Sequence, residues 1–292
     1  MKIDPEILFH PYAPGTLLRV TGEDAATFLQ GQFTNDLSKL AEGESAYGLW
    51  LDRRGRVLAD STVVRRRNGP GYWIASLYSD GSTLGQHLSD HVIADEVEIQ
   101  DETGAWAGMA LMGSGAGEVL GAAGLPGFGF PGRRGGVETW EWLYPRAAQD
   151  AASGFGAGRR KVSDAEMELR RIRAVIPRVP VDIGPADLPN EGGLDAVAIS
   201  YSKGCYLGQE VMARVKALGR VRRTLVRVAG PGTAPVPPAA LWNGAAREGE
   251  LRSVAAGPDG FEGLALVPVG TASAGAALAL ESGGPAVVTL ST

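Results

Sequence analysis

Apolar positions in the first part of the chain fall into short blocks that are separated by polar turns. Residues 17–20 are apolar enough for a strand, and Thr21 then gives a helix-capping signal. Ala25, Phe28 and Leu29 follow at the three- and four-residue spacing of a helix. This stretch therefore predicts a strand followed by a short helix.

A hairpin is predicted next along the chain. Residues 49–51 and 57–64 have the composition of strands, and Gly55 lies in the turn between them, where a positive φ costs a glycine little. Further elements are expected in this half from apolar runs and helical spacing: two strands at residues 72–77 and 106–112, and a helix at residues 82–91.

A longer helix is predicted behind a capping box at Ser163–Glu166 and ends before Pro177. Its apolar face repeats every three or four residues, at Ala165, Leu169, Ile172 and Ile176. Arg170, Arg171 and Arg173 fall outside this stripe. We therefore expect the three arginines on a solvent-facing side of the helix.

The pattern changes after a second amphipathic stretch, from Leu207 to Leu218, which stops at Gly219. Beyond about residue 220, short strand-like runs alternate with glycine and proline turns, and no helix-length pattern remains. The fold class expected is α+β. Residues 1–219 would form an α/β domain of two subdomains, and residues 220–292 a small C-terminal β-barrel.

Composition and charge indicate the cellular environment in which this protein is expected to work. The chain has 292 residues, of which 44% are hydrophobic, a net charge of -5 and a single cysteine, so no disulfide forms within it. The N-terminus lacks the pattern of a signal peptide, and no apolar run approaches the roughly 20 residues of a membrane span. We expect a cytoplasmic protein that has no membrane contact and, with three histidines and one cysteine, no metal site of its own.

The single cysteine, Cys205, is the sharpest candidate for chemistry. Lys203 stands two residues before it, and a helix is expected to start near Leu207, so an ammonium group or free helix amides could favour the reactive thiolate. Glycines at positions 204 and 208 would let another molecule approach the backbone. A second interpretation stays open, in which Cys205 is a small buried apolar residue.

Two other segments carry polar groups that could bind a ligand. From Val211 to Ala246 there are six basic residues and no acidic one, which suits a ligand with carboxylates or phosphates: Arg214, Lys216, Arg220, Arg222, Arg223 and Arg227. Residues 30–36 offer amides and a carboxylate after the first helix, and these groups suit the edge of a heteroaromatic ring. Such residues are also ordinary loop formers.

Three motifs in this order resemble a known family. Residues 28–36, residues 55–60 and above all the octapeptide Lys203–Glu210 are similar to motifs of the YgfZ-type folate-binding proteins. The resemblance covers nearly the whole chain. It implies a fold shared with the glycine cleavage T-protein, an aminomethyltransferase: two ferredoxin-like α/β subdomains forming a folate-site core, and a C-terminal β-barrel.

The resemblance also implies roles for particular residues. Cys205 would be the functional thiol, and tetrahydrofolate would be the cofactor. The candidate cofactor-binding residues come from all three motifs and from the helix before Pro177: Gln32, Asn35, Asp60, Arg173, Lys203, Gly204, Tyr206, Gln209, Glu210 and Arg214.

Two departures from the aminomethyltransferases bear on the reaction. Their strand motif carries an acidic pair, of which only Asp60 remains here beside Ala59. Their pterin-holding glutamate corresponds to Arg173, and the glycine of the following turn to Val175. An arginine only donates hydrogen bonds and cannot replace a carboxylate that accepts them. The departures argue against aminomethyl transfer.

Three functions compete on this basis. The first is a tetrahydrofolate-binding accessory protein that supports assembly or repair of iron–sulfur enzymes, including one that thiomethylates tRNA, with iron–sulfur proteins or their assembly factors as partners. The second is a folate-dependent one-carbon transferase. The third is an RNA-binding module using the barrel and the basic stretch. Direct nucleic-acid binding by this protein is not expected, because the pI is acidic and no aromatic residues stand between the arginines.

Overall fold

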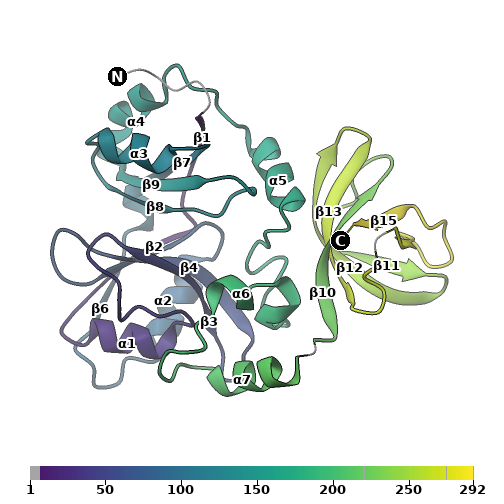
Figure 1. Cartoon of the computed structure of the whole chain (residues 1–292), viewed down its shortest axis with the longest axis horizontal. Helices are drawn as coiled ribbons and strands as arrows, with labels where there is room; N and C mark the ends of the chain where they lie inside the picture. The colour runs from purple at the N-terminus through teal and green to yellow at the C-terminus, as the bar shows by residue number, and fades with distance from the viewer. Residues whose placement is uncertain (1–6, 220, 274, 292) are drawn as a thin grey trace.

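The computed structural model describes residues 7–219, 221–273 and 275–291 (Figure 1). Its strands form three sheets, and two of these lie one above the other while the third forms a separate body beside them. Within the described residues, no helix has the length and apolar character needed to cross a membrane.

The first subdomain has the ferredoxin-like strand order with one additional edge strand. Its five antiparallel strands lie in the order β3-β4-β5-β2-β6. The predicted hairpin is confirmed as β3–β4, and Gly55 in its turn has φ +72°. The elements are β2 (Thr16–Thr21), α1 (Ala25–Gln32), β3 (Ser45–Leu51), β4 (Val57–Arg65), β5 (Tyr72–Ser76), α2 (Gly81–Ser89) and β6 (Glu98–Asp101).

The second subdomain completes the same strand order with a strand from the start of the chain. Its sheet runs β1-β7-β9-β8, and β1 pairs antiparallel with β7. The sequence pattern did not predict β1, so the two subdomains are not simply consecutive. The elements are β1 (Leu8–Tyr12), η1 (Thr103–Ala105), β7 (Trp106–Met112), α3 (Ala116–Ala122), β8 (Phe128–Pro131), β9 (Thr139–Pro145), η2 (Arg146–Ala148) and α4 (Gln149–Gly156).

Each sheet carries helices on one face and meets the other sheet on its opposite face. Helices α1 and α2 pack on the first sheet around Phe28 and Leu84, and α3 and α4 pack on the second around Trp142. Between the two sheets lies a smaller cluster of buried residues: Leu17, Val64, Ala75, Phe130 and Leu143. Two recesses flank this cluster at the interface between the sheets.

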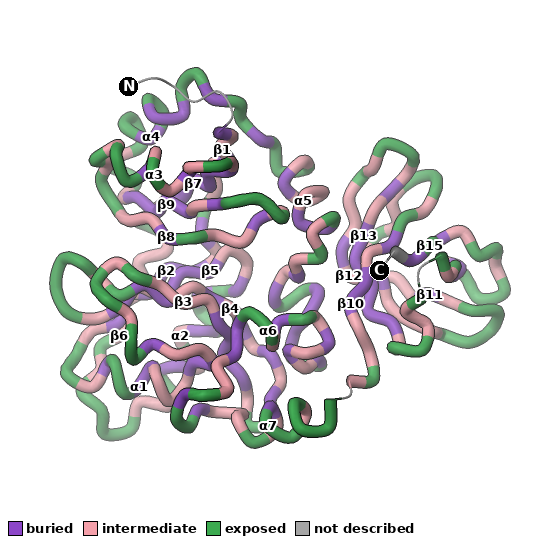
Figure 2. Tube along the Cα trace, viewed as in Figure 1, coloured by how far each residue is buried: buried purple, intermediate pink, exposed green. Residues whose placement is uncertain are grey.

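A largely irregular segment links the two subdomains to the barrel. It contains α5 (Asp164–Arg173), η3 (Pro189–Gly192), α6 (Asp195–Ala198) and α7 (Gln209–Leu218). The Ser163 hydroxyl caps α5 by accepting a hydrogen bond from the Glu166 amide, as predicted. Tube colouring by burial shows that this segment alternates between buried and exposed stretches (Figure 2).

The predicted buried face of α5 is wrong in two respects. Ala165 is exposed, while Arg171 is buried at 2% exposure. The Arg171 guanidinium pairs with Asp182 at 2.6 Å and Glu168 at 2.6 Å. A buried charge is stable only with such partners, and Asp182 comes from the loop after the helix, which helix periodicity does not predict.

Six antiparallel strands form the C-terminal barrel, in the order β11-β12-β13-β10-β15-β14. The sheet closes because Trp242 of β11 and Ala279 after β14 exchange two backbone hydrogen bonds. This confirms the predicted β-barrel. The predicted division at residue 220 falls between α7 and β10, and Arg220 itself lies outside the described residues. The strands are β10 (Arg223–Gly230), β11 (Ala239–Asn243), β12 (Ala246–Gly257), β13 (Gly260–Pro268), β14 (Ala277–Leu278) and β15 (Val288–Ser291).

Candidate functional site

The octapeptide Lys203–Glu210 forms a loop that ends in the first turn of α7. The Leu207 amide donates to the Gly31 carbonyl at 3.0 Å, which joins the loop to the end of α1. Gly208 has φ +85°, and a Cβ there would lie 2.8 Å from the Asp52 carbonyl oxygen in the β3–β4 turn. A glycine is therefore required at this position for the loop to pack against the first subdomain.

Lys203 anchors this loop. Its ammonium donates hydrogen bonds to three backbone carbonyls, those of Gln30 at 2.7 Å, Phe33 at 2.6 Å and Asn35 at 2.9 Å. Burial lowers the pKa of Lys203 to about 8, and the carboxylate of Asp36 opposes that shift. All three donors are used by the end of α1 and the loop after it. The contacts give Lys203 a structural role.

Cys205 is exposed, although Lys203 and Tyr206 on either side of it are buried. Exposure excludes the interpretation of this thiol as a buried apolar residue. Gly204 beside it is also exposed and has open space around its Cα. The thiol is therefore accessible to another molecule, and the buried neighbours hold its backbone in place.

The remaining predicted residues of the motif lie in less constrained positions. Gln209 accepts a hydrogen bond from the Tyr206 amide at 3.3 Å, and Glu210 and Arg214 are exposed on α7. No group of three or more histidine, cysteine, aspartate or glutamate side chains in the described part of the chain is arranged to hold a metal ion.

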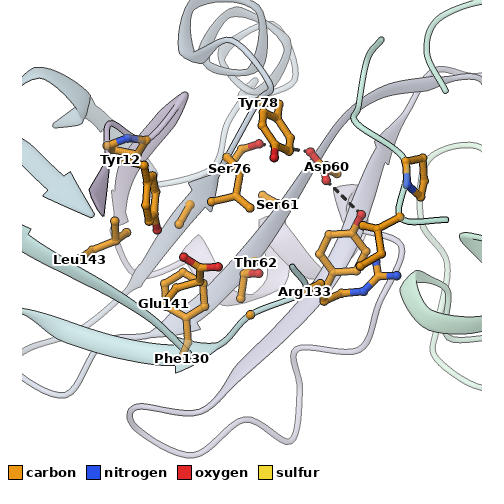
Figure 3. A pocket seen from close by; sticks show the side chains of 17 residues that line it. Tyr12, Asp60, Ser61, Thr62, Ser76, Tyr78, Phe130, Arg133, Glu141 and Leu143 are labelled. Carbon is orange, nitrogen blue, oxygen red and sulfur yellow. Dashed lines mark hydrogen bonds between the residues drawn. The ribbon is translucent and has the colours of Figure 1, made fainter. Parts of the chain in front are cut away.

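A recess, which we call the central pocket, lies between the two subdomain sheets. Figure 3 shows Asp60, Thr62 and Ser76 of the first sheet facing Phe130, Glu141 and Leu143 of the second. Its volume is about 40 Å³, which is room for a few water molecules. Tyr12, Tyr47, Tyr78 and Arg133 complete the polar part of its lining.

Asp60 is a half-buried carboxyl group in the wall of the central pocket. It accepts hydrogen bonds from the hydroxyls of Tyr47 at 3.0 Å, Ser79 at 2.9 Å and Ser76 at 3.2 Å. Burial raises the pKa of Asp60, while the three hydroxyl donors oppose the shift. Burial and the negative charge of Asp60 also hold the pKa of Tyr47 well above its usual value.

Glu141 on β9 provides the second carboxyl group. It pairs with Arg134 at 2.7 Å, and both side chains are almost fully buried. The Arg134 guanidinium lies 4.1 Å from the ring centre of Tyr12, whose hydroxyl has no hydrogen-bond partner among the described residues. Burial, followed by the Glu141 charge, raises the pKa of Tyr12. The Tyr12 hydroxyl thus lies at the pocket wall close to the Glu141 carboxylate, without a hydrogen bond of regular geometry among the described residues.

Arg133 lines the central pocket beside Tyr47. Its guanidinium lies 4.4 Å from the ring centre of Tyr47, as expected for a cation–π contact. The residue belongs to the loop that joins β8 to β9. Arg133 and Tyr47 therefore form one part of the pocket wall.

The cysteine loop and the central pocket are connected through β3. Lys203 holds the carbonyl of Asn35, and the Asn35 side-chain amide donates to the carbonyl of Tyr47 at 2.8 Å. The hydroxyl of Tyr47 in turn donates to Asp60. Asn35 and Tyr47 each make hydrogen bonds on both sides, and together they link the motif that carries the thiol to the half-buried carboxyl group of Asp60.

Arg173 and Gln32, two of the predicted cofactor-binding residues, lie outside the central pocket. Arg173 is on the exposed end of α5 and pairs with Glu262 of the barrel at 2.6 Å. The Gln32 side-chain oxygen is buried without a hydrogen-bond partner in the part of the chain that the structure describes, but Gln32 does not line the central pocket. Of the predicted residues, only Asp60 lines it.

Sequence reasoning missed Tyr12, Tyr47, Arg133 and Glu141. One of them had a detectable signal: Glu141 is a single charged residue within the apolar strand Thr139–Pro145. A lone charge in such a strand indicates a buried pair or a polar site. The others lie in segments that only the packing of the two sheets brings together.

Comparisons with known proteins agree with this architecture. The family described as GCVT N-terminal domain matches residues 16–125. The solved structure of the glycine cleavage system aminomethyltransferase T from Bartonella henselae superposes with a TM-score of 0.80 at 21% identity, over 98% of this chain and 85% of that one. The chain therefore has the fold of the aminomethyltransferases.

Sequence relatives specify the family within that fold. The tRNA-modifying protein YgfZ of Edwardsiella ictaluri is 29% identical over 228 residues, which are 73% of this chain and 68% of the relative. The mitochondrial iron-sulfur cluster assembly factor IBA57 of Homo sapiens is 30% identical over 236 residues, 73% of this chain and 64% of the relative. These similarities support the YgfZ-type family that the motifs predicted.

Proposed function

We propose that this protein is an accessory factor for iron–sulfur enzymes, that it binds tetrahydrofolate in the central pocket, and that Cys205 is its functional thiol. Relatives named as an iron–sulfur cluster assembly factor and as a tRNA-modifying protein support the iron–sulfur role. The observation that carries the proposal is the exposed thiol on a loop fixed by Lys203 and hydrogen-bonded onward to Asp60.

The chemistry of the central pocket suits a pterin. A pterin edge presents paired N–H donors and a carbonyl acceptor, so it needs a carboxylate or hydroxyl oxygen opposite it. Asp60 offers the carboxyl group, and the hydroxyl of Tyr12 offers a further donor or acceptor. The pocket must widen for the pterin to enter, since the present volume admits only water.

Cys205 would act together with groups from another molecule. One cysteine supplies one thiolate, whereas iron–sulfur clusters are held by four protein ligands, and the described residues contain no cluster of further ligands. An exposed thiol can reach a partner's cluster or a partner's cysteine. A client iron–sulfur protein or an assembly factor is therefore the partner class we propose.

The thiol is tested by genetic complementation. A strain that lacks this gene should lose activity of its iron–sulfur enzymes, and a Cys205→Ala copy should fail to restore it. Ser202→Ala is the matched control, because Ser202 is exposed in the same loop and carries no thiol. Full restoration by the Cys205→Ala copy would remove the thiol from the proposal.

Folate binding is tested by titration with tetrahydrofolate. Asp60→Leu should weaken binding at least about tenfold, since it removes the half-buried acceptor, while Arg173→Gln should leave it unchanged because Arg173 pairs with Glu262 outside the pocket. Equal binding by wild type and Asp60→Leu would contradict the pocket assignment. Formation of methylene-tetrahydrofolate from an aminomethyl donor would instead support the one-carbon transferase, which the departures at Ala59 and Arg173 disfavour.

A further inference from the structure

A second and larger recess opens at the other end of the interface between the two sheets, and we call it the arginine–tryptophan groove. It has a volume of about 530 Å³, and no aspartate or glutamate among the described residues lines it. Its walls come from the β4–β5 hairpin, the starts of β7 and β8, helix α3 and β9: Gly43, Val64–Asn68, Trp73, Trp106, Gly117, Leu120, Gly121, Gly124, Leu125, Gly127–Gly129, Trp140 and Trp142.

Aromatic rings form one wall of the groove. Trp73 lies with its ring centre 5.4 Å from that of Phe128 at an interplanar angle of 9°, and 5.2 Å from that of Trp106. All three side chains are only partly buried. The hydrophobic cluster beneath them holds the rings in place, so they offer a fixed apolar surface to a planar ligand.

Three consecutive arginines, Arg65 to Arg67, form the rim on the β4–β5 hairpin. Arg65 donates to the Leu40 carbonyl at 2.7 Å, and Arg66 donates to the Pro70 carbonyl at 2.6 Å and lies 5.5 Å from the Trp73 ring centre. None of the three pairs with a carboxylate among the described residues, unlike Arg19 nearby, which pairs with Glu102 at 3.0 Å. The rim therefore carries positive charge that no ion pair in this part of the chain neutralises.

Glycines leave the facing wall open. At Gly121 on α3 and at Gly124 after it, a Cβ added to the backbone would have no neighbouring atom within 4 Å. Side chains at these positions would project into open space, and their absence keeps the groove wide opposite the aromatic rings. A ligand can thus reach both the rings and the arginines.

We propose that the arginine–tryptophan groove binds an unpaired nucleotide of single-stranded RNA, with the base stacked on the aromatic wall and the flanking phosphates against the arginines. Bases stack on exposed aromatic rings regardless of sequence, and guanidinium groups bind phosphates. An acidic peptide would satisfy the arginines but leaves the rings without a planar partner. The groove differs from the basic stretch at residues 211–246, where no aromatic residues stand between the arginines.

The inference goes beyond the proposed function and does not depend on folate or on Cys205. The first test is binding of a fluorescent single-stranded RNA of about 10 nucleotides to the full chain at several salt concentrations. Arg65→Gln/Arg67→Gln should weaken binding at least about tenfold and reduce the slope of log affinity against log salt by about 1.4, at about 0.7 for each lost phosphate contact. Arg160→Gln/Arg247→Gln makes the same change in net charge at exposed sites outside the groove, and it should leave the slope unchanged.

A second test changes the open wall without touching the arginines. Gly121→Glu places a carboxylate in the groove, and Gly121→Gln adds a side chain of the same size without charge. Binding should be weakest for Gly121→Glu and intermediate for Gly121→Gln. Gly85→Glu on α2 is the control, because a Cβ at Gly85 also meets no atom within 4 Å and lies outside the groove.

Competition experiments distinguish the ligand classes. Unlabelled single-stranded RNA should displace the probe, while duplex RNA and poly-glutamate should compete at least about tenfold less well, because neither offers an unstacked base. Equal competition by poly-glutamate would overturn the proposal in favour of an acidic protein surface. Equal loss of binding in the Arg160→Gln/Arg247→Gln control would also overturn it, by showing that net charge alone is responsible.

Discussion

The two recesses between the subdomain sheets share strands but have opposite electrostatics. On β4, Asp60 and Thr62 line the central pocket, while Val64 and Arg65 line the arginine–tryptophan groove. Asp60 and Arg65 are about 17 Å apart along an extended strand. The pocket buries carboxyl groups that have partners, whereas the groove exposes arginines that lack acidic partners among the described residues.

This difference follows from solvent access. A charge removed from water must be paired or hydrogen-bonded, so Glu141 and Asp60 come with Arg134, tyrosine and serine partners. Arg65 and Arg67 at the rim are exposed, so they keep their hydration and need no acidic partner to be stable. A polar group that the fold does not require is free to bind a ligand, and by this criterion the groove is the more adaptable of the two sites.

The largest expected loss of stability comes from breaking the buried ion pair of Arg134 and Glu141 at the central pocket. Glu141→Leu leaves the Arg134 charge buried without its partner and should lower the free energy of unfolding by about 3–5 kcal/mol. Urea denaturation measures the loss. The double variant Arg134→Met/Glu141→Leu should recover most of it, because it removes both charges. A double variant no more stable than the single one would show that the pair is not the cause.

Lys203 provides the next test, since it is a buried cation with partners outside either recess. Lys203→Met leaves three backbone carbonyls without their donor and should cost roughly 2 kcal/mol of unfolding free energy. Lys216→Met is the control, because Lys216 is exposed and its ammonium lies over the ring of Tyr201. Equal losses in the two variants would contradict the anchoring role.

The pH dependence of stability tests the environment of Asp60. Burial raises its pKa in the folded state above the unfolded value, so between about pH 4 and the folded-state pKa the folded protein holds more protons than the unfolded one. The free energy of unfolding should then fall as pH rises through the folded-state pKa, relative to the Asp60→Asn variant, which does not titrate there. Parallel pH profiles of the two proteins would place the Asp60 carboxyl in a more polar environment.

The smallest effect is expected at the rim of the groove. Arg67→Gln removes an exposed charge that has no acidic partner among the residues described, and it should change the free energy of unfolding by less than about 0.5 kcal/mol. This loss of unfolding free energy is expected to be much smaller than that of Glu141→Leu, because the buried pair supports the fold and the rim arginine does not. A loss as large as that of the buried pair would show that the rim arginines support the fold, and it would weaken their assignment to a ligand.

Much of the fold was predictable because it depends on local patterns. The β3–β4 hairpin, the capped start of α5 and the all-β character after residue 220 each leave a signal within a few consecutive residues. The family was predictable from the Lys203–Glu210 motif. The β1 strand was missed because its partner, β7, lies far along the chain, with Leu8 paired to Met112.

The roles of the site residues also divide into those that a local motif predicts and those that depend on contacts with distant segments. The motifs predicted Cys205, Asp60 and Lys203 as site residues. The structure adds that the Lys203 ammonium anchors its loop through three backbone carbonyls, which the motif did not predict. The sequence pattern also placed Arg171 in solvent, although Asp182 makes its burial possible. A side chain's partners are set by segments that fold against it, and spacing along one element does not contain them.

The sequence by itself determined many of the helices and strands, the class of fold, the resemblance to a family and the single thiol, because each rests on local composition or on short contiguous motifs. Only the tertiary structure decided which polar groups meet between the sheets. It joined Tyr12, Asp60 and Glu141 in one recess and Arg66, Trp73 and Phe128 in another. These sets come from strands far apart in the chain, and they meet because two sheets bury their helix-free faces against each other.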